Sequence, residues 1–154
     1  MKYLKPGILC LFTICICAIT SAQKILNPKE PEIKKARLFN DIPDRVSVVA
    51  SKLTPLLALK KGEITSISFS DKITFKGTVA STASKYDDAI RSIVIKLDDC
   101  PGATLTVSRI KKADGTEYYR GRIISFQHGD CFELKTENGQ YILVKKNFED
   151  MVND

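Results

Sequence analysis

The amino-acid sequence predicts a mainly β fold, a small antiparallel barrel or sandwich of six to seven strands preceded by one short helix. From residue 64 onward, apolar residues alternate with polar ones, which is the period of half-buried strands. Tight-turn dipeptides such as Asp114-Gly115 and Asn138-Gly139 separate these runs. No helical pattern lies between the strands, which favours antiparallel pairing over βαβ units.

The first 22 residues have the pattern of a secretory signal peptide. Lys2 and Lys5 precede an uncharged apolar run over residues 7–19, and Thr20-Ser21-Ala22 supplies small residues for cleavage. The run is shorter than the roughly 20 residues that span a bilayer. We therefore expect cleavage near Ala22-Gln23 and a secreted or periplasmic protein, whose membrane contact is limited to this cleaved segment.

The rest of the chain is expected to divide into two parts. Residues 23–44 are charged and rich in proline, which predicts a flexible lead-in. Residues 45–154 form a single β-rich domain, long enough to bury a core. Loss of two lysines with the signal peptide lowers the formal net charge from +6 to +4, and the remaining charges are mixed in sign. This pattern argues against nucleic-acid binding and favours another secreted or cell-envelope protein as partner.

The helix is expected at about residues 52–60. Leucines recur there at helical spacing, either Ser51 or Thr54 can act as N-cap, and Pro55 suits a first helical position. Gly62 suits the position just past the end. Residues 45–50 could form a short strand, and residues 81–91 are expected to be a polar connection. The strands after the helix are expected at residues 64–70, 73–79, 92–97, 103–110, 118–125, 131–136 and 140–146.

Two cysteines remain after removal of the signal peptide. Cys100 and Cys131 form an even pair in an exported protein, which is consistent with one disulfide. The alternative is two separate buried thiols, because a sequence does not show whether two Cα atoms approach closely enough to bridge.

The single histidine lies in SFQHGDCFEL, residues 125–134. His128, Asp130 and Cys131 form a candidate interaction loop between two expected strands. The chain has no HExxH, CxxC or GxSxG motif and no phosphate-binding glycine loop. We therefore expect no catalytic residue, no metal and no cofactor, with Gly129-Asp130 supplying turn chemistry.

Part of the chain resembles a known protein segment. The stretches YDDAIRSIVIKL, CPGATLTVSRIKKADGTEYYRGRIISFQHGDCFEL and NGQYILVKK resemble the β-rich, prodomain-like segment that precedes the catalytic domain of some secreted bacterial metallopeptidases. The resemblance covers roughly residues 64–146, and no HExxH peptidase motif accompanies it. It implies an inhibitor that presents Asp130 or Cys131 to the zinc of a peptidase.

These observations lead to an expected function with two alternatives. The leading expectation is an exported, non-catalytic β-domain that acts as a binding or accessory module. The first alternative is the prodomain-like inhibitor of a secreted metallopeptidase. The second is a small hydrolase that uses His128, which would require an exposed cleft holding His128, Asp130 and a nucleophile.

Overall fold

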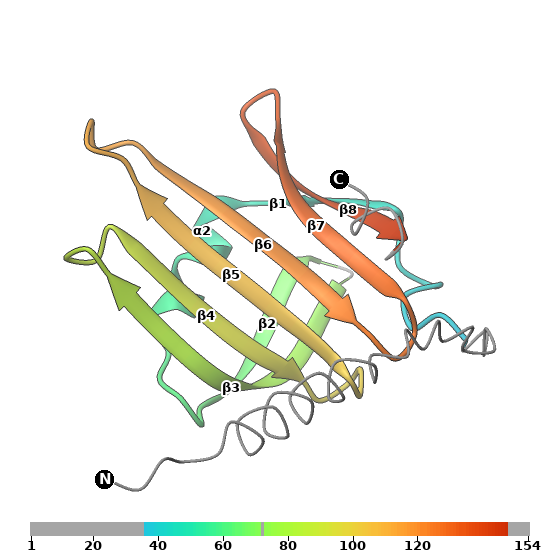
Figure 1. Cartoon of the computed structure of the whole chain (residues 1–154). Helices are drawn as coiled ribbons and strands as arrows, with labels where there is room; N and C mark the ends of the chain where they lie inside the picture. Colours follow the sequence, from blue (N-terminus) through green and yellow to red (C-terminus); the bar gives the residue numbers. More distant parts are fainter. Residues whose placement is uncertain (1–35, 72, 148–154) are drawn as a thin grey trace, which may run out of the picture. The chain divides into compact units, whose positions relative to one another are not determined.

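The computed structural model of the chain describes residues 36–71 and 73–147 (Figure 1). The predicted signal peptide, residues 23–35 of the predicted lead-in and residues 148–154 lie outside the described residues. Within the described ranges, no helix has the length and apolar character needed to cross a bilayer.

The described residues form one antiparallel sheet of eight strands, in the spatial order β1-β8-β7-β6-β5-β4-β3-β2. The seven strands after residue 64 follow one another as a meander, which confirms the predicted mainly β class. The total is eight rather than six to seven because Arg45–Val48 joins the same sheet beside β8. The strands are β1 (Arg45–Val48), β2 (Ile64–Ser70), β3 (Ile73–Lys85), β4 (Ile90–Leu97), β5 (Ala103–Lys111), β6 (Glu117–Ser125), β7 (Asp130–Glu137) and β8 (Gln140–Asn147).

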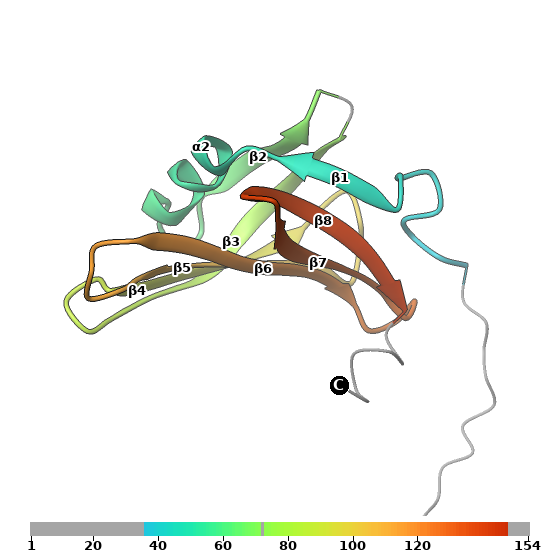
Figure 2. The same cartoon turned by 90° about the horizontal axis from the view of Figure 1, so that it is seen from above.

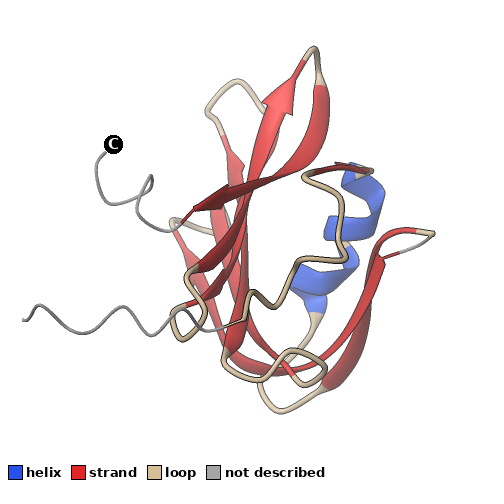
Figure 3. Ribbon diagram, turned by 90° about the vertical axis from the view of Figure 1, so that its right-hand side faces the viewer, coloured by secondary structure: helices blue, strands red, loops and turns tan. Residues whose placement is uncertain are grey.

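The sheet curls into a nearly closed barrel (Figure 3). Its two edge strands, β1 and β2, come close together but are not hydrogen-bonded neighbours. The connection between them contains two short helices, α2 (Ala50–Leu53) and η2 (Pro55–Ala58), which follow β1 and lie beside β2 (Figure 2). The helical segment therefore lies on the side of the barrel where β1 and β2 approach each other.

The predicted helix over residues 52–60 is split into these two pieces. Pro55 lacks an N–H group, and the chain changes there from an α-helix to a 3₁₀ helix. Val49 is the N-cap of α2, and Thr54 is the N-cap of η2 with Pro55 after it, as one of the two predicted alternatives has it, although Thr54 makes no side-chain cap hydrogen bond. Thr54 Oγ1 instead lies 2.7 Å from the hydroxyl of buried Tyr119 on β6, which holds the helical segment against the sheet.

The core lies inside the curved sheet and beneath the two helices. Every second residue of β3 is buried from Ile73 to Val79, whereas β6 ends and β7 begins with three consecutive buried residues. The fully buried large side chains are Phe39, Phe132, Leu53, Ile93, Ile95, Leu105, Ile123, Val79 and Val107.

Phe39 contributes to this core from the segment predicted as lead-in. Its side chain is 1% exposed, and its ring centroid lies 5.4 Å from that of Phe132 and 6.4 Å from that of Phe75. Leu38 and Ile42 pack partly against the same cluster. Residues 38–42 are therefore part of the packed domain.

Strand β3 is longer than the sequence predicts. Residues 81–85, expected in a polar connection, continue the strand and pair with β4. The turn that follows places Tyr86, Asp87 and Asp88 at positive φ. At Gly77 a Cβ atom would lie 2.6 Å from Ile95 Cγ2, so glycine is needed because β4 approaches closely there.

Candidate functional site

The histidine-containing segment is a turn between β6 and β7. Ser125 ends β6 and pairs with Asp130 at the start of β7. The N–H of His128 donates to the carbonyl of Ser125 at 3.3 Å, and Gly129 takes a positive φ of 64°. The segment therefore follows the geometry of a short hairpin connection.

His128 is bonded locally within this turn. Its Nδ1 lies 2.9 Å from Oγ of Ser125, three residues earlier in the chain. Ser125 is completely buried. A substrate carbonyl cannot reach this hydroxyl without unfolding the turn. The hydrogen bond between Ser125 and His128 therefore stabilises the hairpin connection.

Asp130 and Cys131 are also withdrawn from the surface. Asp130 is 3% exposed, and its carboxylate accepts a hydrogen bond from the backbone N–H of Leu38. Cys131 is completely buried, and its desolvation raises the pKa of the thiol to about 11. The thiol is consequently protonated at neutral pH and is a poor nucleophile and metal ligand.

The candidate loop therefore does not bring its side chains together at an accessible point. His128 bonds to Ser125, while Asp130 bonds to the segment before β1. Nowhere in the described parts of the chain do three or more histidine, cysteine, aspartate or glutamate side chains gather as a group that could hold a metal ion.

The structure does not support a disulfide, because no S–S bond joins Cys100 to Cys131. Cys100 lies in the turn that leads into β5, whereas Cys131 lies on β7 and pairs with Ile124 on β6. Strands β5 and β7 are separated by β6, and two strand spacings amount to about 10 Å. A disulfide requires Cα atoms less than about 7 Å apart.

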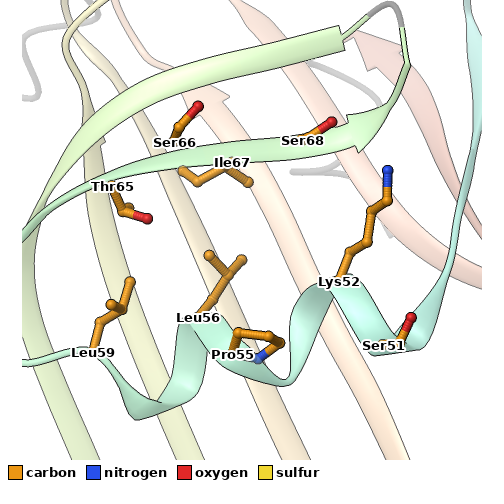
Figure 4. A pocket seen from close by; sticks show the side chains of 9 residues that line it. All are labelled: Ser51, Lys52, Pro55, Leu56, Leu59, Thr65, Ser66, Ile67 and Ser68. Atoms are coloured by element: carbon orange, nitrogen blue, oxygen red, sulfur yellow. The ribbon is translucent and has the colours of Figure 1, made fainter.

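A groove with a volume of about 390 Å³ lies between the helical segment and β2 (Figure 4). Its helical wall is apolar near Leu56 and Leu59 and carries Lys52 at one end. Its strand wall carries three hydroxyl side chains. The lining residues are Ser51, Lys52, Pro55, Leu56, Leu59, Thr65, Ser66, Ile67 and Ser68.

The backbone of β2 presents hydrogen-bonding groups to this groove. Val79 of β3 exchanges hydrogen bonds with Gly62 and Glu63, at 2.9 Å each. Because bonded pairs alternate along an antiparallel ladder, Thr65 and Ile67 also bond to β3. The N–H and C=O groups of Ile64, Ser66 and Ser68 therefore point away from β3, toward the free edge.

Lys52 is the cationic group of the groove. Its side chain extends from α2 toward the Ser68 end of β2 (Figure 4). In the described part of the chain, no acidic side chain forms a salt bridge with it. The groove thus combines an unpaired ammonium group, free backbone donors and acceptors, and an apolar floor.

Sequence reasoning did not identify this groove. The signal that could have indicated it is the composition of β2, ITSISFS, a strand without a charged residue or a proline. Edge strands usually carry such residues as protection against pairing with other chains. Comparisons of the chain with protein-family models, curated proteins and solved structures find no match.

Proposed function

We propose that this protein is an exported, non-catalytic β-domain that acts as a binding or accessory module for another secreted or cell-envelope protein. The observation that carries the proposal is the groove between α2–η2 and β2, where a cation and an unpaired strand edge meet an apolar floor. Concave sites of this kind, mostly apolar with a few placed polar groups, are the usual form of binding sites.

The burial of the residues on either side of the histidine-containing turn favours binding over hydrolysis. Ser125 and Cys131 are completely buried, and the thiol of Cys131 has a raised pKa. Presentation of Asp130 or Cys131 to the zinc of a metallopeptidase would require this turn to open and the bond from Leu38 to break. The groove, in contrast, already has exposed lining residues, among them Lys52 and Ser66.

Capture experiments with groove variants test the proposal. The full chain with a C-terminal affinity tag is expressed in its native host and recovered from the envelope and secreted fractions. We compare the wild type with Lys52→Glu, inside the groove, and with Lys96→Glu, an exposed lysine on β4 that does not line it. A partner recovered by the wild type and Lys96→Glu, and reduced at least fivefold by Lys52→Glu, supports the proposal.

Two results would overturn it. One is equal recovery of the same proteins by all three forms. The other is hydrolysis of ester or peptide substrates that disappears in His128→Ala, since a hydrolase would depend on that imidazole. Export is tested on the same material, because signal-peptide cleavage predicts a mature protein whose mass corresponds to Gln23 as its first residue.

A further inference from the structure

We propose that the groove binds an extended peptide segment of the partner, which adds as a strand to the free edge of β2 and places a carboxylate beside Lys52. This inference rests on the proposed binding function and names the chemistry of the partner. Strand addition takes its affinity from main-chain hydrogen bonds and its selectivity from alternate side chains.

The register of β2 defines the bonds that such a peptide would make. Ser66 lies midway along the strand wall, and its N–H and C=O groups point into the groove. Ile64 and Ser68 offer the same groups on either side. In the part of the chain that the structure describes, no hydrogen bond joins the helical segment to these three backbone positions.

The size of the groove suits a short extended segment. An extended residue occupies about 160 Å³, from a rise of about 3.4 Å, a strand spacing of about 4.8 Å and a layer thickness of about 10 Å. A volume of about 390 Å³ therefore admits roughly two to three residues at the centre of a longer strand. The span from Ile64 to Ser68 is about 13 Å, so the groove encloses the central part of a strand that pairs with all three positions.

The two edge strands of the sheet differ in how well they are protected against pairing with an added strand. β2 is seven residues long and contains no lysine, arginine or proline. β1, the other edge, has four residues and begins with Arg45, which forms an ion pair with Glu137. A short charged edge resists added strands, whereas a long uncharged edge accepts them.

A single strand fits this edge better than a second copy of the barrel. Helices α2 and η2 lie along the free edge of β2, so an incoming strand must enter between helix and strand (Figure 4). In a second copy, the corresponding strand carries the same helices along its own edge. Pairing the two edges would bring these helices into collision.

Lys52 gives the groove a preference for a peptide with an acidic side chain. Its ammonium group stands at the Ser68 end of the groove, and no acidic residue of the described chain pairs with it. A glutamate or aspartate on the peptide would provide that partner. A lysine or arginine at the same place would meet like charge.

The probe is a fluorescein-labelled hexapeptide, Thr-Val-Glu-Val-Thr-Val, blocked at both ends and measured by fluorescence anisotropy with the full chain. We expect it to bind at least tenfold more tightly than the same peptide N-methylated at every backbone amide, which has no N–H group left to donate to β2. We expect Lys52→Glu to reverse the preference between this peptide and one with lysine in place of glutamate.

Two substitutions at Ser66 separate the backbone from the side chain. Ser66→Pro removes an N–H that the barrel does not use, so it should fold and should weaken the peptide at least tenfold. Ser66→Ala removes the hydroxyl and keeps the N–H, so it should bind like the wild type. Amide hydrogen exchange of the wild type gives a measurement that does not depend on how Ser66→Pro folds. Bound peptide should slow exchange at Ile64, Ser66 and Ser68, while Thr65 and Ile67 change little.

The outcomes distinguish this inference from the proposed function. Equal binding of the methylated peptide, or protection without the alternation along β2, overturns strand addition. If no peptide binds but a native partner is still captured in a Lys52-dependent manner, strand addition is overturned and the binding function stands. If neither the peptide nor any partner depends on Lys52, both fail.

Discussion

Replacement of Phe39 by alanine should remove a large part of the stability of the domain. A phenylalanine side chain buries about 200 Å², and Phe39 is 1% exposed. At about 25 cal/mol per Å² its burial is worth about 5 kcal/mol, of which alanine retains roughly a third. The cavity left beside Phe75 and Phe132 adds to this loss, so we expect the free energy of unfolding to fall by about 3–5 kcal/mol.

The measurement is equilibrium unfolding in urea, followed by circular dichroism, with Phe126→Ala as the matched control. Phe126 is 73% exposed, so the same chemical change should alter the free energy of unfolding by less than about 0.5 kcal/mol. A truncated chain that begins at Arg45 should lose at least as much stability as Phe39→Ala. A loss below about 1 kcal/mol for Phe39→Ala would refute the assignment of this residue to the core.

Three further changes test other contacts. Burial raises the pKa of the Cys131 thiol from 9.0 to about 11, so the folded protein favours the protonated thiol. The free energy of unfolding should keep this contribution below pH 9 and fall by about 2 kcal/mol as the pH rises to 11. Urea unfolding of Cys131→Ala across the same pH range should show no such thiol-linked loss. Asp87 has a φ of 51°, so Asp87→Gly should raise the thermal midpoint, with a gain of about 0.5–1 kcal/mol, whereas Asp41→Gly, at a position without positive φ, should not. Tyr119→Phe removes the 2.7 Å contact with Thr54, and it should lower the free energy of unfolding by about 1 kcal/mol in urea.

The strands could be predicted where one face of the sheet is buried and the other is not. Residues 73–79 alternate cleanly because Ile73, Phe75 and Val79 enter the core. Residues 81–85 belong to the same strand but are exposed on both faces, so they carry no alternation and resemble a loop. Phe39 could not be placed either, because a periodic pattern needs several apolar residues and only Leu38 stands beside it between charged and turn-forming residues.

The histidine-containing turn and the groove show why the candidate site was harder to predict than the fold. Side-chain chemistry is visible in a sequence, and it drew attention to His128, Asp130 and Cys131. Burial, which a sequence does not specify residue by residue, removes Asp130 and Cys131 from the surface. The groove depends instead on backbone groups of β2, and every residue except proline carries the same two. What makes those groups available is the position of β2 at an edge of the sheet, beside helices that form no hydrogen bond with the Ser66 backbone within the described residues. The feature of this sequence that bears on binding is thus the lack of charge in ITSISFS, and its meaning emerges only once that strand is known to be an edge.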